Sequence, residues 1–443
     1  MLKSFRFKIT FLICALSGLG SAAFAQAKLK PTVSKLSNEI QGKLVEWRRD
    51  FHENPELSNR EFKTAEKVAK HLTDLGLEVK TGIAHTGVVG VLKGGKPGPV
   101  VGLRADMDAL PVVERVDIPF ASKVKGEYEG REVGVMHACG HDSHIAILMG
   151  TAEVLSKVKK DLKGTVVFIF QPAEEGAPSG EEGGAKLMVK EGVIKDYGIE
   201  AVFGLHINSQ TEAGKIGYKP GGTMASANRF TITVKGKQVH GAYPWSGIDP
   251  IVTSSQIIMG LQTIVSRSSE LTNEAAVVSI GHIDGGVRNN IIPEEVKLDG
   301  TFRALDENMR LKIVEKINLI ATNIAESAGA TAEVHIHEGY PVTFNDPELT
   351  NTMAPSLVEA AGEENVFLRK AVTGAEDFSF FAKEVPGLFF FLGGMPVGMN
   401  PKDAAPHHTP DFYLDESGFS VGVKAFSFLT LDYMDKAEKM AGK

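Results

Sequence analysis

The sequence predicts an α/β protein of two domains, in which a smaller α+β unit is inserted into a larger domain built on a mainly parallel sheet. Amphipathic helical patterns alternate with short apolar runs in the first half of the chain, which is typical of buried parallel strands with helices on both faces. Strands of alternating polarity replace them in the middle, and the first pattern then resumes. A chain of 443 residues is also too long for one typical domain.

The larger domain is predicted at residues 26–226 and 339–443. Helical patterns at 33–50, 61–75 and 143–158 accompany apolar runs at 99–103, 165–170 and 201–205. Later come helix-like segments near Leu349 and Phe378, an apolar strand at 388–392 and a closing helix at 417–439. Polar residues follow the strands, with His206 after the third, and ligands bind at the carboxyl ends of strands in such sheets. We therefore expect a site there.

The inserted unit is predicted at residues 227–338. Strand patterns at 229–234, 276–280, 296–303 and 332–337 enclose helical patterns at 250–266 and 309–328. The order strand, helix, strand, strand, helix, strand is ferredoxin-like. Its sequence contains no metal-type cluster of its own.

Residues 1–25 are predicted to be a signal peptide. A positive segment containing Lys3 and Arg6 precedes an apolar core at 9–19, and Ala23-Phe24-Ala25 has the small-x-small form of a cleavage site. We expect an exported, periplasmic or secreted protein. A membrane anchor is the weaker alternative, because the apolar stretch is short for a bilayer span.

Export constrains the partners and the redox chemistry. A lipid anchor at Cys14 is disfavoured because Ile13 precedes it, so no stable membrane anchor is expected after cleavage. Cys139 is then the sole cysteine, which excludes an internal disulfide. The formal net charge of −7 becomes more negative without the basic signal segment, and this argues against nucleic acid as a partner.

The densest group of metal-binding side chains is the sequence MHACGHDSH at 136–144. Cys139 and His141 flank Gly140, where a bend can direct a thiolate and an imidazole at one ion. A structural zinc finger would need a second pair of soft ligands, and no cysteine follows Cys139. The missing ligands must be His, Asp or Glu from elsewhere, which is the composition of a catalytic site. His137 and His144 are expected to pack or hydrogen-bond around them.

Glu174 and Glu175 are adjacent on a predicted loop, so their side chains point in different directions. One can bind metal while the other accepts a proton from water. The alternative is a solvated acidic loop. His206 and one of His407 and His408 can supply further nitrogen ligands; for His206 the alternative is a satisfied core histidine, and spacing alone leaves the choice in the HHT sequence open.

Seven motifs together resemble one family. They are GLRADMDALP at 102–111, MHACGHDSH, FQPAEEG at 170–176, GLHI at 204–207, VKGKQVHGAYP at 234–244, TGAEDFSFF at 373–381 and HHTPDF at 407–412. The chain is similar to the aminoacylase and carboxypeptidase family of dinuclear metal amidohydrolases, in its subgroup of hippurate hydrolases, N-acyl-amino-acid amidohydrolases and indole-acetyl-amino-acid hydrolases. The motifs span nearly the whole mature chain in the family's order.

The resemblance implies a site with two divalent ions, zinc or manganese, with nickel or cobalt as alternatives. The positions that match ligands are Cys139, His141, Glu175, His206 and His408, with the cysteine as a bridge. Glu174 matches the general base, and Asp106 matches a carboxylate that supports the ligands. Many members have His-x-Asp at Arg104-Ala105-Asp106 and Asp at Cys139, but the subgroup shares both changes. The thiolate favours zinc, whereas the carboxylate and imidazoles also suit manganese.

The resemblance also makes the inserted unit a lid and dimerisation domain. His240 matches a histidine that reaches the partner subunit's site and stabilises the oxyanion, although by position alone it would be a surface histidine. Asn290 and Arg303 match residues that hold the substrate's carboxylate or amide. A homodimer through the lid is therefore expected.

The expected activity is metal-dependent hydrolysis of the amide bond of small N-acyl amino acids, hippurate-like or N-acetyl. A dipeptidase or carboxypeptidase using the same site is the alternative, because the pocket's shape cannot be read from the sequence. A third interpretation is an exported metal or peptide binding protein without catalysis. Such a protein would have no use for Glu174 beside Glu175 or for a lid.

Overall fold

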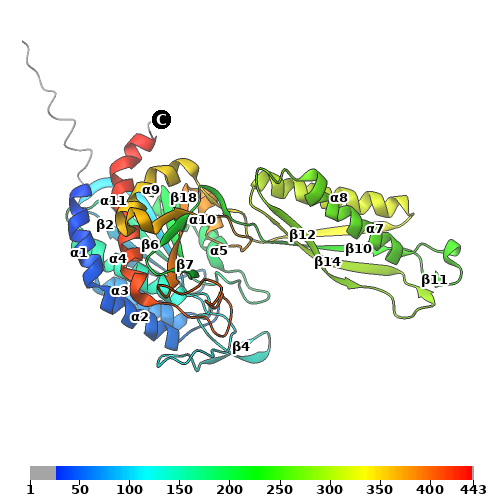
Figure 1. Ribbon diagram of the computed structural model, residues 1–443, viewed down its shortest axis with the longest axis horizontal. Coiled ribbons are helices and arrows are strands. Elements are labelled where there is room, and N and C mark those ends of the chain that lie inside the picture. The colour runs from blue at the N-terminus through cyan, green and yellow to red at the C-terminus, as the bar shows by residue number, and fades with distance from the viewer. Residues whose placement is uncertain (1–25, 442–443) are drawn as a thin grey trace, which may run out of the picture.

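The computed structural model describes residues 26–441, so the predicted signal peptide and Cys14 lie outside the described part. It has a larger body built around one sheet and an elongated smaller body that projects from it (Figure 1). The smaller body extends from Asn228 to Glu338 and has its own apolar core. The predicted two-domain α/β architecture is confirmed.

The larger body is organised around an eight-stranded mixed sheet of order β1-β2-β6-β3-β7-β18-β8-β17. Its strands are β1 (Glu78–Ile83), β2 (Gly87–Lys93), β3 (Lys96–Asp106), β6 (Lys163–Gln171), β7 (Ala201–Glu212), β8 (Ile216–Tyr218), β17 (Val366–Leu368) and β18 (Gly387–Met395). The four central strands β6, β3, β7 and β18 are parallel, as predicted. The antiparallel edge strands β1 and β2 were not predicted; they form a hairpin whose tight turn contains Ala84 and His85 with positive φ.

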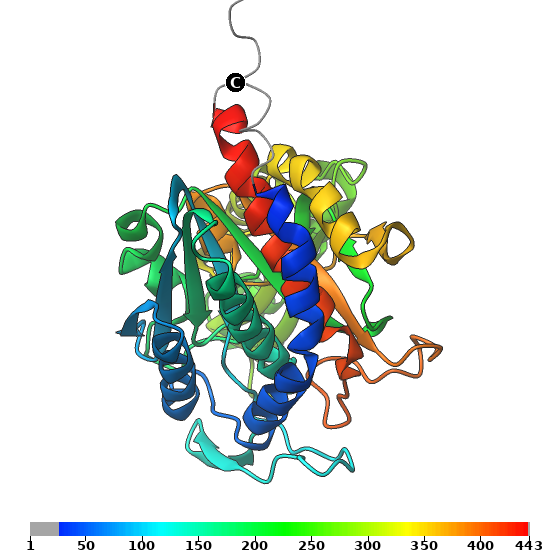
Figure 2. The same ribbon diagram turned by 90° about the vertical axis from the view of Figure 1, so that its left-hand side faces the viewer.

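Helices cover both faces of this sheet. One face carries α1 (Lys30–Glu39), α2 (Gln41–Glu53), α3 (Phe62–Asp74), α4 (His141–Lys157), α9 (Pro347–Ala361) and α11 (Phe419–Ala441), several of which are in front of the sheet in Figure 2. The other face carries α5 (Gly184–Lys190), α6 (Val193–Tyr197) and α10 (Ser379–Glu384). Successive side chains of β6 point to opposite faces of the sheet. Phe168 packs in the apolar core on the first face, and Val167 packs in the core on the second face.

One segment that was predicted to be a single helix forms two helices. Residues 33–50 form two helices, α1 and α2, which meet at the buried Ile40. Its ψ of −9° departs from the ideal α-helical value. The break lets α1 pack mainly on α11 while α2 packs on α4. None of the described helices has the length and apolar character needed to cross a membrane.

The smaller body has the predicted ferredoxin-like order. Its elements are β10 (Asn228–Lys235), α7 (Pro250–Thr263), β12 (Ala276–Asp284), β14 (Glu295–Ala304), α8 (Glu307–Ser327) and β15 (Thr331–Glu338). The strands form an antiparallel sheet of order β12-β14-β10-β15, and both helices pack on it through a shared apolar core. A short ribbon of β11 (Val239–His240) and β13 (Ile291–Ile292) lies at the far tip (Figure 1).

Two further strand pairs belong to the larger body. The hairpin of β4 (Lys125–Tyr128) and β5 (Arg131–Gly134) projects from one side, and β9 (Gly221–Met224) pairs with β16 (Thr343–Asn345) where the chain passes between the bodies. These strands are short and largely polar or exposed, so they lack the apolar periodicity that identified the longer elements.

Candidate active site

A cluster of His, Cys, Asp and Glu side chains lies where β3, β6 and β7 approach the first turn of α4. β3 ends at Asp106, and the loop after β6 carries Glu174 and Glu175. The expectation that polar residues after these strands converge is confirmed for β3 and β6. His206 also lies in the cluster, but it is inside the third strand and not after it, because β7 continues to Glu212.

Cys139 is at the centre of the cluster. Its Sγ lies 3.2 Å from Nε2 of His408, 3.4 Å from Nε2 of His206 and 3.7 Å from Nδ1 of His407. Burial raises the pKa of the Cys139 thiol well above its usual value, and the charge of Glu175 adds to the effect. Without a cation the thiol therefore stays protonated, whereas a divalent ion would favour the thiolate.

Gly140 makes the predicted bend. Its φ of 90° is left-handed, and a Cβ there would lie 2.4 Å from Cγ2 of Ile207. The helix after the bend begins at His141, two residues earlier than predicted. The backbone thus brings Cys139 and His141 to the same site.

His141 has one nitrogen bound and one free. Nδ1 lies 2.8 Å from the carbonyl oxygen of Asp108 and 3.2 Å from its carboxylate. Nε2 is buried without a hydrogen-bond partner among the described residues, 3.9 Å from Glu174 and 3.8 Å from Glu175. A ring held by Nδ1 with a free Nε2 is the usual arrangement of a metal-binding histidine.

Asp108 is a site residue that the sequence interpretation missed. Its two carboxylate oxygens accept the backbone N–H groups of Glu174 and Glu175 at 3.1 and 3.0 Å, and one also accepts the hydroxyl of Ser58 at 2.7 Å. It therefore fixes the loop that carries both glutamates. The signal was present in the Asp-x-Asp sequence, whose first member alone was assigned a role.

Asp106 supports a different histidine. Its Oδ1 lies 2.6 Å from Nδ1 of His144, whose Nε2 accepts the backbone N–H of Ile207 at 2.8 Å. Both ring nitrogens of His144 are thus occupied, in agreement with its expected packing role. His137 also packs: it is buried with neither nitrogen hydrogen-bonded, and desolvation lowers its pKa to about 3.

Arg104 is wholly buried beside this cluster. Its guanidinium lies 2.6 Å from Asp106, 2.8 Å from Glu376 and 2.9 Å from Asp377. It thus offsets the negative charge of three carboxylates that would otherwise repel one another. Glu376 and Asp377 were not predicted as site residues, because they are far from Arg104 in the sequence and only the folded chain brings them beside it.

Glu174 and Glu175 have different surroundings, as their adjacency predicted. Oε1 of Glu175 pairs with Nε2 of His408 at 3.1 Å. Glu174 is buried, and its carboxylate accepts only a long bond from the N–H of Asp377 at 3.4 Å. Burial, together with the charges of Glu376 and Glu175, raises the pKa of Glu174 well above its usual value.

The two histidines of the HHT sequence also differ. His407 is partly buried, with Nδ1 3.2 Å from the carbonyl of Cys139 and Nε2 accepting the N–H of Ser209 at 3.2 Å. His408 is half-exposed, has a left-handed φ of 63°, and turns Nε2 toward Cys139 and Glu175. The ring nitrogens of His407 are thus occupied by the backbone, whereas Nε2 of His408 faces the cluster.

Two hollows flank the cluster. One, of about 300 Å³, is lined by Cys139, Glu174, Glu175, His206, Asn208, Met224, Tyr340, Arg369, Val372, Gly374, Ala375, Glu376, Phe391, His407 and His408. The other, of about 490 Å³, lies between the β4–β5 hairpin and the loop after Glu175, with Leu57, Leu110 and Tyr128 among its walls. Glu175 borders both hollows.

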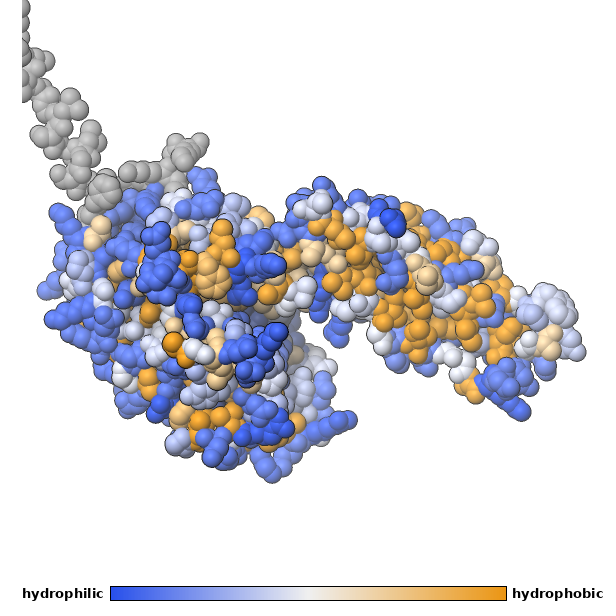
Figure 3. Space-filling view, viewed as in Figure 1, coloured by the Kyte–Doolittle hydropathy of each residue, from blue (hydrophilic) through white to orange (hydrophobic). Residues whose placement is uncertain are grey.

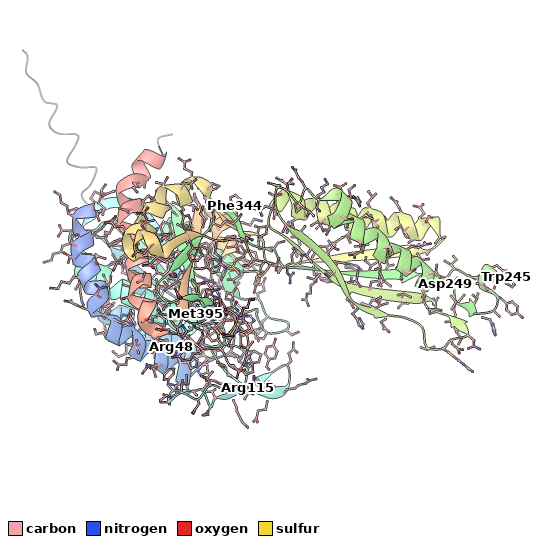
Figure 4. The ribbon with its side chains drawn as sticks, in the orientation of Figure 1. Arg48, Arg115, Trp245, Asp249, Phe344 and Met395 are labelled. Atoms are coloured by element: carbon pink, nitrogen blue, oxygen red, sulfur yellow. The ribbon has the colours of Figure 1, made fainter. Side chains whose placement is uncertain are left out.

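The three predicted lid residues, His240, Asn290 and Arg303, all lie in the smaller body and do not contact this cluster within the described chain. His240 and Asn290 lie together at the lid tip, where Gly241 N–H donates to the carbonyl of Asn290 at 2.8 Å. Figure 4 marks the same tip by Trp245. Arg303 is on β14, where Nη1 donates to the hydroxyl of Thr301 at 2.9 Å and partial burial lowers its pKa.

The donor set fits a pair of divalent ions. Nε2 of His141 is a buried polar atom without a hydrogen-bond partner among the described residues, and such an atom costs stability unless a ligand satisfies it. Ligand atoms of Cys139, Glu175 and His408 lie within 4.8 Å of one another, as do those of His141, Glu174 and Glu175. Glu175 belongs to both groups, so it could contribute to two neighbouring ions.

Comparison with known proteins identifies the family. The model of Peptidase family M20/M25/M40 matches residues 102–432. The chain belongs to this family. It is 42% identical over 411 residues to thermostable carboxypeptidase 2 of Saccharolobus solfataricus, covering 91% of this chain and 99% of that one. It is 39% identical over 391 residues to an N-acetylcysteine deacetylase of Bacillus subtilis, covering 88% and 96%.

A solved structure supports the same membership. A Bacillus subtilis protein, described as a dinuclear metal binding peptidase of the M20 family, superposes with a TM-score of 0.75 at 36% identity, covering 90% of this chain and 99% of that chain. The resemblance drawn from the motifs is therefore confirmed. This M20 chain is a hydrolase of amide or peptide bonds.

Proposed function

We propose that this M20 hydrolase cleaves the amide bond of small N-acyl amino acids. The observation that carries the proposal is the pair Glu174 and Glu175, one buried with a raised pKa and no strong hydrogen bond, the other among candidate metal ligands. Two adjacent carboxylates in such different surroundings can divide the tasks of proton transfer and metal binding.

Cys139, His141, Glu175, His206 and His408 would hold two divalent ions. Bound there, the ions supply Lewis acidity that polarises an amide carbonyl and acidifies water. Zinc is the ion we favour, because a thiolate and imidazoles are its preferred ligands; manganese is the next choice, followed by nickel and cobalt.

Glu174 acts as the general base and then as the acid. Its high proton affinity lets it take a proton from water near neutral pH and deliver it to the leaving nitrogen. The hydroxyl of Tyr340 donates to the backbone carbonyl of Glu174 at 2.6 Å and helps hold the residue in position. Asp106 would not contact the ions. It supports the site by holding His144 and Arg104 in position beside the ligands.

The lid completes the site in a homodimer. His240 is exposed at the lid tip and stabilises the oxyanion in the partner's site, while Asn290 and Arg303 hold the substrate's carboxylate or amide. Trp245 and Val287, 78% and 93% exposed, are available for contact between subunits. Figure 3 shows apolar side chains gathered over one face of the lid.

The substrate class follows from the size of the hollow and the known relatives. A volume of about 300 Å³ suits one small acyl group or side chain. Similarity to a protein named N-acetylcysteine deacetylase supports N-acyl amino acids as the substrates of this chain, and similarity to a protein named thermostable carboxypeptidase supports peptides as the second candidate. A binding protein without catalysis would not need the buried Glu174. The chain acts after export, with residues 1–25 removed.

A substrate panel tests this proposal. The purified mature protein, loaded with Zn²⁺ or Mn²⁺, is assayed for amine release from hippurate, N-acetyl-methionine and several dipeptides, before and after chelation. Chelator-sensitive cleavage that is fastest with the acyl amino acids is the expected result. Faster cleavage of the dipeptides would favour the peptidase alternative, and no cleavage of any member would contradict the proposal.

A further inference from the structure

Arg369 is a cation with no neighbour of opposite charge to pair with among the described residues, and it lies in the wall of the hollow that contains Glu174. Among the described residues, no carboxylate pairs with its guanidinium and no acceptor is hydrogen-bonded to it. Partial burial alone lowers the pKa of Arg369 to about 10, so the side chain stays charged at neutral pH. A partly desolvated charge without a partner is costly, and proteins keep such groups mainly where a ligand supplies the opposite charge.

The side chain is held in place by its surroundings. The backbone N–H of Arg369 donates to the carbonyl of Tyr218 at 3.0 Å, which extends the pairing of β17 with β8. Its stem crosses Gly217, where a Cβ would lie 3.5 Å from Cδ of Arg369. The guanidinium then stacks on Phe391, with its central carbon 3.4 Å from the ring centroid.

Phe391 links this cation to the candidate metal ligands. On neighbouring strands Phe391 is directly opposite His206, and the two rings are 6.3 Å apart. Arg369 therefore has a fixed position beside the candidate metal ligands, in the wall of the same hollow as Glu174. Met224 and Val372 add apolar surface to that hollow.

We propose that Arg369 is a specificity-determining residue that binds a carboxylate of the substrate in addition to the α-carboxylate. The favoured substrates are thus N-acyl amino acids with a second negative charge, either on the amino-acid side chain or at the end of a dicarboxylic acyl group. This inference rests on the proposed amidohydrolase function and narrows its substrate class. The apolar walls accommodate the methylene groups between the two charges.

Matched substrate pairs test the assignment. N-acetyl-glutamate is compared with N-acetyl-glutamine, and N-succinyl-alanine with its terminal amide, each pair differing only in the second charge. The wild-type enzyme is expected to prefer the acid of one pair by tenfold or more in kcat/KM. The pair that shows the preference identifies which end of the substrate contacts Arg369.

The variant Arg369→Gln should abolish that preference by slowing cleavage of the acid, while cleavage of the amide changes by about twofold or less. Arg369→Lys should restore part of it, and Arg267→Gln, which removes an exposed lid charge, should leave it intact. Calorimetric titration of the metal-loaded variants with glutarate gives a readout independent of turnover. Weaker binding is expected for Arg369→Gln alone.

Two results would overturn the inference and separate it from the proposed function. If N-acetyl-methionine is cleaved but neither pair shows a preference, or the preference persists in Arg369→Gln, the assignment of Arg369 is wrong and the amidohydrolase function stands. If no acyl amino acid is cleaved at all, the proposed function and this inference fail together.

Discussion

The carboxylate of Asp108 lies 3.2 Å from Nδ1 of His141, and the carbonyl oxygen of the same residue lies closer, at 2.8 Å. One residue thus fixes the orientation of the ring and leaves Nε2 directed into the site. The same carboxylate accepts the backbone N–H groups of Glu174 and Glu175. Two chain segments that carry the chemistry are therefore positioned by a single residue.

Asp108→Asn should weaken metal binding. An asparagine side chain has one acceptor oxygen in place of two, so it cannot accept from Glu174, Glu175 and Ser58 as the carboxylate does. We expect metal affinity to fall roughly 10- to 100-fold, as is typical when a partner of a metal ligand is lost. Competition with a chelating dye measures the change, and Asp117→Asn at an exposed position is the control. Unchanged metal affinity in Asp108→Asn would show that Asp108 does not position the metal ligands.

Glu174→Gln should separate catalysis from metal binding. Glutamine keeps the shape of the side chain but cannot accept the proton, so kcat should fall by roughly 10²- to 10⁴-fold. Metal content, measured by atomic emission, should stay at the wild-type level because Glu174 is not among the proposed ligands. Glu46→Gln on the exposed face of α2 is the matched control. A near-normal kcat would show that another group is the base.

The buried ion pair of Arg48 with Asp142 should contribute strongly to stability. Nε of Arg48 lies 2.9 Å from Oδ2 of Asp142, and His52 Nδ1 lies 2.7 Å from the same oxygen. Figure 4 shows Arg48 in the larger body. Arg48→Met removes the cation from a buried ion pair and leaves the Asp142 carboxylate with the His52 hydrogen bond alone, at a cost of about 3 to 5 kcal/mol. Urea unfolding at neutral pH measures this, with Arg267→Met as the surface control.

The effect should depend on pH. Burial alone would raise the pKa of Asp142, but the charge of Arg48 and the hydrogen bond with His52 lower it below its usual value. A carboxyl with a lowered pKa in the folded state contributes stability above its unfolded pKa, near pH 4, and loses it as the pH falls toward the folded value. The difference between wild type and Arg48→Met should therefore shrink below about pH 4. A difference that grew in acid would contradict this sign.

The sequence predicted the elements that are long and strongly periodic, such as the parallel strands β3, β6 and β7 and the helix α8. It could not predict partners that are remote in the chain. Arg104 meets Glu376 and Asp377 only because the fold brings β3 beside the segment before α10. Nor could spacing distinguish His407 from His408, because both rings approach Cys139 in the fold. They differ in that the ring nitrogens of His407 also contact backbone groups, whereas Nε2 of His408 lies beside Cys139 and Glu175.

Mixing two inactive variants tests the proposed exchange between subunits. His240 is in β11 at the lid tip, and Figure 1 shows β11 far from β6, the strand that leads to Glu174, so a complete site would need both subunits. His240→Ala and Glu174→Gln should each be nearly inactive alone. In a hybrid dimer, the chain with His240→Ala keeps its own Glu174 and receives an intact His240 from the other chain. One complete site results.

Activity should therefore reappear when the two variants are dissociated, mixed and reassociated. Random assortment makes half of the dimers hybrids with one working site of two, so recovery should approach roughly a quarter of wild-type activity per subunit. Mixing His240→Ala with wild type controls for damage during reassociation. If the mixture stays as inactive as its components while hybrids are detected by mass spectrometry, His240 does not act across the interface.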